Sequence, residues 1–352
     1  MIDNKTWIAH VAKDFFPIWK NRLDSNENVE INLLAPNFYK VQFSSSPQEQ
    51  ILSNSIFSRY WFPVDFMWPT KVHEKGFVEK CAQGLNKKFS QTKFRNVIVF
   101  SFHRQHQSLA SNLRGRLLQT LNENLSHFSA EKQIQEWTKN PCSQPVENEV
   151  LIVALSDKCV FAGTCPLKVA GSVFGGGRHY VRVSNPTIAS RAAAKFVEAV
   201  EFLKMKQMNL DNPRKWLELG AAPGGVTYEI AQRKNEVWAI DKADFDKELL
   251  KNPLVHFFQI DARDFKTDLR FEALFCDLNG PSYLASEIAS EKASAINSKG
   301  VIIFTFKVHV MDDFETDLRK IVNLFETRGC HLLSARHLYN NKQEITLFFQ
   351  KA

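Results

Sequence analysis

The stretch from Trp216 to Gly225 constrains the fold of this chain more than any other. Leu217 and Leu219 alternate with the polar Glu218, as in a short strand, and three glycines with a proline then form a tight turn. Residues 226–234 follow with the 3.6-residue period of a helix. A strand, a glycine turn and a helix expose backbone N–H groups to a nucleotide-like ligand.

The spacing of the glycines separates two classes of cofactor. Dinucleotide-binding proteins have Gly-x-Gly-x-x-Gly, whereas this turn reads Gly-x-x-x-Gly-Gly with Pro223 inside it. Glu218 before the turn is typical of proteins that bind S-adenosylmethionine (SAM), which has no pyrophosphate. The next predicted strand, 236–240, is followed by Asp241, about 20 residues after the first glycine, where a carboxylate can hold ribose hydroxyls. We therefore predict a SAM site, with an NAD-dependent oxidoreductase as a distant alternative.

From residue 185 onward, predicted strands and helices alternate, beginning with a helix that runs to Met208. Such alternation predicts a parallel sheet covered on both faces. Only Tyr339–Lys342 separates the final two strands, and so short a link requires a hairpin that reverses the final strand. Seven strands with one reversed are typical of SAM-dependent methyltransferases. The predicted strands are 215–219, 236–240, 254–259, 271–276, 300–307, 331–338 and 343–350.

The sequence of the amino-terminal half predicts smaller α+β units. We expect helices at 7–23, 51–61 and 108–121, and strands at 29–34, 39–43, 96–102, 150–155 and 159–163. The glycine- and arginine-rich stretch 171–182 is predicted to be a flexible connector, either a plain linker or a loop that contacts a nucleic-acid backbone. We divide the chain into 1–72, an α+β unit; 73–184, a domain with the basic connector; and 185–352, the SAM domain.

The positive charge of the chain is concentrated in two stretches. The net charge is +7, and residues 71–116 hold ten basic residues against two acids, while residues 158–195 hold six basic residues and no acid. A polyanion such as RNA would be attracted to both stretches, although a solvated basic surface is the structural alternative. The residues that we expect to contact RNA are Lys87, Lys88, Arg114, Arg116, Arg178, Arg182 and Arg191.

Cysteine usage and hydropathy indicate the compartment. The six cysteines lack CxxC spacing, which predicts reduced thiols and neither a disulfide framework nor a zinc site. No apolar run approaches about 18 residues, and charged residues among the first 20 argue against a signal peptide. We expect a cytoplasmic protein that needs no metal and does not enter a membrane. The oligomeric state is not predicted.

Four ionisable residues fall where such a sheet binds its ligand, over the carboxyl ends of the strands. Asp277 and Lys307 each follow an apolar strand, and Glu344 begins the final one. Lys195 lies on the helix before the first strand, among alanines that permit close approach of another chain segment. Each residue alone could be an ordinary solvated end residue.

In this order the four residues resemble the Lys-Asp-Lys-Glu tetrad of RNA ribose 2′-O-methyltransferases with the FtsJ fold. Several segments are similar to the RlmM family, which methylates cytidine 2′-O in large-subunit ribosomal RNA. The similar segments are Ser190–Ala199, the glycine turn, Cys276-Asp277 and Leu338–Thr346, and more weakly 56–62 and 160–164. The resemblance implies an amino-terminal ferredoxin-like unit followed by a THUMP domain, an RNA-binding module. Val226 and the segment Leu278–Pro281 depart from the family pattern, the latter where the target nucleotide would be contacted.

The chemistry of methyl transfer suggests a role for each residue of the tetrad. A ribose hydroxyl must lie in line with the methyl group and must lose its proton. We assign Lys307 to proton removal or hydroxyl orientation and Asp277 to positioning Lys307, with Lys195 and Glu344 steering the ribose. The residues expected at the cofactor are Glu218, Gly220, Ala222, Pro223, Gly224, Gly225, Asp241, Asp261 and Asp277.

Three alternatives stay open at this point. Asp261 could meet the adenine amino group or could instead cap a helix. Asn279–Tyr283 faintly resembles the Asn/Asp-Pro-Pro-Tyr motif of enzymes that methylate a base nitrogen. The chain could also be an RNA-binding or ribosome-assembly protein that has lost activity, which the intact glycine turn and the full tetrad disfavour.

Overall fold

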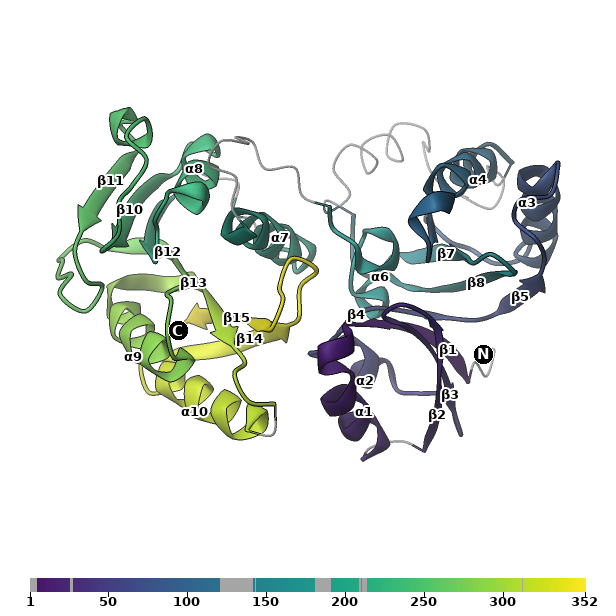
Figure 1. The fold of residues 1–352 in the computed structure, drawn as a ribbon, viewed down its shortest axis with the longest axis horizontal. Helices are drawn as coiled ribbons and strands as arrows, with labels where there is room; N and C mark the ends of the chain where they lie inside the picture. Colours follow the sequence, from purple (N-terminus) through teal and green to yellow (C-terminus); the bar gives the residue numbers. More distant parts are fainter. Residues whose placement is uncertain are drawn as a thin grey trace. The chain divides into compact units, whose positions relative to one another are not determined.

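A computed structural model describes residues 5–25, 28–120, 142, 144–180, 191–208, 210, 214–311 and 313–352. The chain divides into two units, Met1–Arg178 and His179–Ala352, which are considered separately below (Figure 1). The finer boundaries that we set at residues 72 and 184 stay predictions.

The first sheet of the amino-terminal unit has the order β2-β3-β1-β4, and all of its pairings are antiparallel. Helices α1 and α2 lie on one side of it (Figure 1). The aromatic rings of Trp19, Tyr39 and Trp61 meet between helix and sheet. The elements are β1 (Thr6–Val11), η1 (Lys13–Phe15), α1 (Phe16–Asp24), β2 (Val29–Ala35), β3 (Phe38–Phe43), α2 (Glu49–Ser53) and β4 (Ser58–Pro63).

Two of the helix predictions for this region are wrong in part. Residues 7–23 contain strand β1 before helix α1, and residues 51–61 pass from helix α2 into strand β4. Both strands are buried on both faces, with five of the six residues of each buried. Their apolar residues are therefore consecutive and do not alternate, so periodicity cannot distinguish strand from helix.

The second sheet of this unit has the order β5-β8-β7-β6, with β6 and β7 parallel and the other pairs antiparallel. Helices α3 and α4 pack on it through a cluster that includes Phe77, Leu85, Leu113 and Val153. The elements are β5 (Phe66–Pro69), α3 (Phe77–Lys88), β6 (Asn96–Ser101), η2 (Arg104–His106), α4 (Gln107–Thr120), β7 (Glu149–Leu155), β8 (Cys159–Pro166), α6 (Leu167–Ala170) and η4 (Gly175–Gly177).

The structure describes residues 171–180 of the predicted connector. Up to Gly177, this stretch packs within the amino-terminal unit and is not a free linker. Gly176 and Gly177 are buried with φ of 67° and 66°, and a Cβ on Gly177 would lie 2.6 Å from the carbonyl oxygen of Arg59. The carbonyl of Gly176 is 2.7 Å from Nδ1 of His10. These glycines permit close packing within the unit, which a sequence pattern cannot distinguish from flexibility.

The carboxyl-terminal unit contains the predicted seven-stranded sheet, in the order β11-β10-β9-β12-β13-β15-β14. β15 is antiparallel to both of its neighbours, as the hairpin predicted, and the remaining pairs are parallel. The strands are β9 (Lys215–Leu219), β10 (Glu236–Asp241), β11 (Val255–Gln259), β12 (Phe271–Cys276), β13 (Ile296–Lys307), β14 (Cys330–Arg336) and β15 (Glu344–Lys351).

Helices cover both faces of this sheet (Figure 1). Val301 and Ile303 of β13 belong to the core beneath α7 and α8. Phe304 and Phe306 point to the opposite face and contact Phe325 and Phe314 of α10. The helices are α7 (Arg191–Met205), α8 (Gly225–Gln232), η5 (Leu249–Lys251), α9 (Ser282–Lys292), η6 (Ala293–Ala295) and α10 (Phe314–Glu326). Among the described residues, no helix has both the length and the apolar character needed to cross a membrane.

Candidate active site

Strand alternation places three of the four predicted catalytic side chains on the α7 face of the sheet. Val301 and Ile303 face α7. Lys307 follows them by six and four residues, so it faces α7 as well, at the end of β13. Asp277 follows β12 in the parity of Phe275, which belongs to the same core. Glu344 lies directly opposite Lys307 in the antiparallel β13–β15 pair, and residues opposite one another share a face.

Helix α7 supplies Lys195, which is only 4% exposed. Its Nζ donates to Oδ2 of Asp277 at 2.9 Å and to Oε1 of Glu344 at 3.1 Å. The Nζ of Lys307 lies 3.7 Å from Oδ1 of Asp277. The structure therefore brings the four predicted residues together, with the Asp277 carboxylate between two ammonium groups.

Lys307 is more accessible than Lys195, with 19% of its side chain exposed. Its Nζ donates to the carbonyl oxygen of Leu278 at 2.7 Å and to Oδ1 of Asn279 at 3.1 Å. Ser282, at the start of α9, accepts from the backbone N–H of Lys307 and donates to its carbonyl oxygen. These contacts fix the direction of the Lys307 side chain, and charge-assisted hydrogen bonds of this kind are strong.

Glu198 is a positioning residue that the sequence analysis missed. It lies on α7 and is 7% exposed. Its carboxylate accepts from the backbone N–H groups of Tyr339 and Asn340 at 2.6 and 2.8 Å, and from Nδ2 of Asn340 at 2.6 Å. The carboxylate thus ties α7 to the β14–β15 link, next to Glu344. The sequence did offer a signal for Glu198: an acidic residue three positions after Lys195, on the apolar side of the predicted helix.

A cavity of about 390 Å³ lies over the carboxyl ends of β9, β10 and β12. Five of the predicted cofactor residues line it, namely Gly220, Ala222, Asp241, Asp261 and Asp277. Gly220 has a φ of +87°, and a Cβ there would lie 2.8 Å from the carbonyl oxygen of Asp277. Glycine is therefore required at position 220, where the turn approaches the residue that follows β12. Pro223, Gly224 and Gly225 are not among the lining residues.

Glu218 does not line the cavity either. It is fully buried on β9, and its Oε2 accepts a hydrogen bond from Oγ1 of Thr227 at 2.6 Å. Burial raises the pKa of Glu218 from its ordinary value of 4.5 to about 8. In the structure this residue joins β9 to helix α8.

The two other acids at the cavity shape loops. Asp241 accepts from the N–H groups of Ala222 and Ala243, both at 2.9 Å, and so holds the glycine turn against the end of β10. Asp261 accepts from the backbone N–H and the guanidinium of Arg263, and that guanidinium lowers the pKa of the Asp261 carboxyl. Lys242 lies 3.4 Å from the same carboxylate. Asp261 therefore carries a negative charge at the cavity edge.

The basic residues predicted to contact RNA differ in their surroundings. The side chains of Arg114 and Arg178 donate to backbone carbonyls of β6 and of Phe102, and Arg116 forms a bidentate pair with Glu79. Burial lowers the pKa of Arg114. Lys87, Lys88 and Arg191 are exposed. Arg182 lies outside the described residues.

Residues 188–326 match the family model for the FtsJ-like methyltransferase. This FtsJ-like segment is similar to FtsJ-like methyltransferases over less than half of the chain. Lys195, Asp277 and Lys307 lie inside the FtsJ-like segment, whereas Glu344 is contributed by β15 beyond it. FtsJ-like methyltransferases use S-adenosylmethionine.

Several curated relatives of the chain carry the name "Ribosomal RNA large subunit methyltransferase M". The protein from Methylococcus capsulatus is 29% identical over 168 residues, which covers 46% of this chain and 47% of that protein. The protein from Marinobacter nauticus is 28% identical over 169 residues, again 46% and 47%. The match thus spans about half the length of the curated relatives.

Solved structures resemble the chain only distantly. TrmN from Thermus thermophilus is 13% identical with a TM-score of 0.35, covering 99% of this chain and 100% of that one. A fibrillarin pre-rRNA processing protein from Methanococcus jannaschii is 14% identical with a TM-score of 0.36, covering 59% and 84%. At such TM-scores neither likeness assigns a ligand to the FtsJ-like segment.

Proposed function

We propose that this protein transfers a methyl group from SAM to a ribose 2′-hydroxyl of RNA, with large-subunit ribosomal RNA as the substrate and cytidine as the target. One observation carries the proposal. Asp277 lines the cavity and also contacts the ammonium groups of Lys195 and Lys307. The tetrad and the cavity therefore share a wall, which a transfer between a bound donor and a hydroxyl requires.

The residues at the cavity fit SAM. Asp241 offers a carboxylate to the ribose hydroxyls, and the apolar side chains of Ile240, Ile260 and Ile288 suit an adenine ring. Gly220 and Ala222 keep the turn small on the methionine side. When bound, SAM supplies a methyl group on a sulfonium.

The tetrad then prepares the acceptor. Lys307 is the more accessible of the two lysines. As an ammonium, its Nζ orients the 2′-hydroxyl; only in the neutral amine form can it take the hydroxyl proton as the oxygen–carbon bond forms and the carbon–sulfur bond of SAM breaks. Asp277 holds that Nζ from one side, and the carbonyl of Leu278 holds it from the other. Lys195 and Glu344, both buried, keep Asp277 in place and steer the ribose.

RNA is the proposed partner on three grounds. Relatives that match about half of the chain are named as ribosomal RNA methyltransferases. The exposed Lys87, Lys88 and Arg191 provide positive charge for phosphates. The β-α-β-β-α-β order of residues 6–63 is that of a ferredoxin-like unit, and we assign the second sheet to a THUMP-like module. Action in the cytoplasm belongs to the same proposal.

The test is Lys307→Ala in the full chain, with the exposed Lys320→Ala as a matched control. We expect Lys307→Ala to lose methyl transfer from labelled SAM to undermethylated ribosomal RNA, while calorimetry records nearly unchanged SAM affinity. Digestion of the product should give nucleosides methylated on the ribose, which protect the adjacent phosphodiester from alkali. Retained turnover in Lys307→Ala would refute its role, and base-methylated product would replace the ribose assignment with the base-nitrogen alternative.

A further inference from the structure

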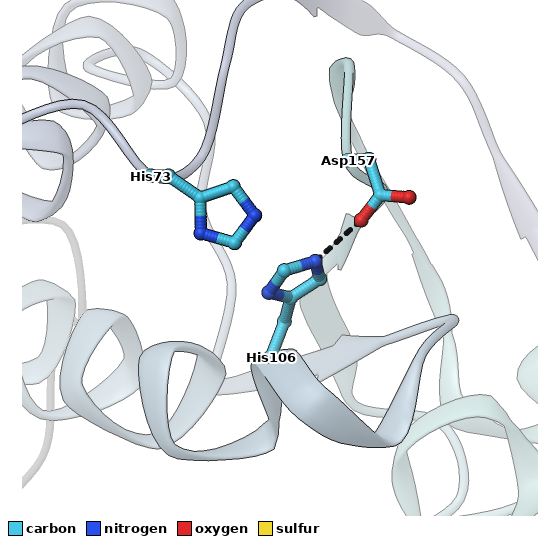
Figure 2. A group of neighbouring side chains, drawn as sticks. All are labelled: His73, His106 and Asp157. Carbon is cyan, nitrogen blue, oxygen red and sulfur yellow. Dashed lines mark hydrogen bonds and ion pairs between the residues drawn. The ribbon is translucent and has the colours of Figure 1, made fainter.

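The amino-terminal unit holds a cluster of metal-ligand side chains that the methyl-transfer proposal does not use. His73, His106 and Asp157 each offer one ligand atom, and these atoms all lie within 4.8 Å of one another. Figure 2 shows the three side chains converging from separate segments. Among the described residues, no other group of three His, Cys, Asp or Glu side chains has its ligand atoms this close together.

Each residue is held at the same end of the second sheet by its local structure. His73 is exposed on the turn after β5, next to Val72, which is buried in the core. His106 ends the 3-10 turn before α4 and is 3% exposed. Asp157 lies in the turn of the β7–β8 hairpin. Three independent segments therefore present ligand atoms to one point, although the residues are far apart in the sequence.

The geometry is close to that of a small cation site. The Nε2 atom of His106 and Oδ1 of Asp157 are 2.5 Å apart, and the imidazole rings of His73 and His106 are 4.7 Å apart at 59°. Ligand atoms on a tetrahedral zinc ion stand about 3.3 Å apart, because zinc–nitrogen and zinc–oxygen bonds are about 2.0–2.2 Å. The short His106–Asp157 contact is a hydrogen bond that zinc would replace, and His73 and Asp157 are exposed, so their side chains can rotate toward the wider spacing.

A fourth ligand is within reach. The Nε2 atom of His103 lies 3.9 Å from Oδ2 of Asp157, and 35% of the His103 side chain is exposed. Gln105 donates to Oδ1 of Asp157 at 3.3 Å and can hold the carboxylate as it turns. Imidazoles with one carboxylate suit zinc and similar divalent transition metals better than calcium or magnesium, which prefer all-oxygen sites.

The surrounding charges do not prevent binding of a cation. The basic residues within two positions of the cluster are Lys71, Lys75, Arg104 and Lys158, and the acid Glu74 directly follows His73; all five are exposed. Exposed charges are screened by water and salt. Asp157 supplies the anionic ligand, and neutral imidazoles supply lone pairs without adding charge.

We propose that His73, His106 and Asp157, with His103 as the fourth ligand, bind a zinc ion that clamps the β5–α3 turn, the start of α4 and the β7–β8 hairpin together. The ion is structural, and the site is independent of the methyl-transfer chemistry. The rival explanation is that His106 and Asp157 form only a structural hydrogen-bonded pair.

The experiment uses the full chain freed of metal by a chelator and titrated with zinc chloride in a calorimeter. We expect one ion per chain, and a loss of affinity of at least roughly 10–100-fold in His73→Gln and in Asp157→Asn, the range found for weaker perturbations of metal sites. His331→Gln, which alters an exposed histidine on β14, is the matched control and should bind as the wild type does.

Two further readouts separate the proposal from its rivals. Cobalt(II) should give a tetrahedral visible spectrum without a thiolate charge-transfer band, because no cysteine belongs to the proposed site. Zinc should raise the thermal midpoint of the wild type but not that of His73→Gln, whose exposed turn position leaves folding intact in circular dichroism. Absence of one-to-one binding, equal binding by both ligand variants and the control, or a thiolate band would overturn the proposal.

Discussion

Replacement of Lys195 by methionine tests whether the tetrad is a buried ion network. Lys195→Met keeps the length and apolar stem of the side chain and removes the ammonium group that both Asp277 and Glu344 contact. The side chains of these two acids are only 9% and 11% exposed. The variant therefore leaves two carboxylates facing each other with little access to water, which is costly.

The expected loss can be estimated. Removing one partner of a buried pair costs about 3–5 kcal/mol. Since about 1 kcal/mol shifts the Tm of a domain of this size by about 2–4 °C, the carboxyl-terminal unit should melt roughly 6–20 °C earlier. The assay is thermal unfolding followed by circular dichroism in parallel with the wild type at neutral pH.

Two variants make the measurement decisive. Lys204→Met, on the same helix, removes a lysine that pairs with Glu201 at 3.6 Å, with both side chains 22% exposed, and should cost no more than about 1 kcal/mol. Adding Glu344→Gln to Lys195→Met should recover part of the stability, because one buried charge disappears with the other. If Lys195→Met melts together with Lys204→Met, the buried network is not formed and the catalytic proposal loses its basis.

Three further predictions concern the turn, its neighbouring acid and the basic surface. Gly220→Ala should destabilise the unit by about 1–3 kcal/mol and weaken SAM binding measured by calorimetry, because φ is +87° and the added Cβ meets Asp277; unchanged binding would contradict this. The pKa of Glu218 is raised by burial, so the folded state retains a proton that the unfolded chain releases and stability falls as pH rises from 4.5 to about 8. Glu218→Gln should show a flatter dependence of its urea midpoint on pH, and an unaltered slope would remove this explanation. Lys87→Gln with Lys88→Gln should lower the salt-dependence slope of RNA binding by about 2 in filter-binding assays, whereas a slope equal to that of Lys320→Gln would exclude phosphate contacts there.

The carboxyl-terminal fold was largely predictable from the sequence. Strands such as 215–219 and 271–276 have the same bounds in the structure, because short apolar runs are separated by helices of clear period. The reversed strand followed from a link too short for a crossover. The meeting of Asp277 and Lys307 was also predictable, because residues at the carboxyl ends of neighbouring parallel strands converge. Glu344 begins the reversed strand at the same edge, whereas the expectation that Lys195 joins them from helix α7 came from the resemblance to the Lys-Asp-Lys-Glu tetrad.

Other features could not be predicted from local patterns. Strand β1 is buried on both faces, so its sequence fits a helix equally well. The packing of Gly176 depends on Phe100, whose ring lies 2.9 Å from where a Cβ would stand, and not on neighbouring residues. His73, His106 and Asp157 come from three segments that are far apart in the sequence, so no short, regular motif spacing marks them.

The position of β15 inside the sheet affects how the protein matures during translation. Glu344 reaches Lys195 across 149 residues, and β14 contacts the rest of the sheet only through β15. A nascent chain that has emerged only as far as β14 has most of its strands but must leave β13 open at one edge. The four-residue cluster is therefore completed only after residues 344–351 have left the exit tunnel.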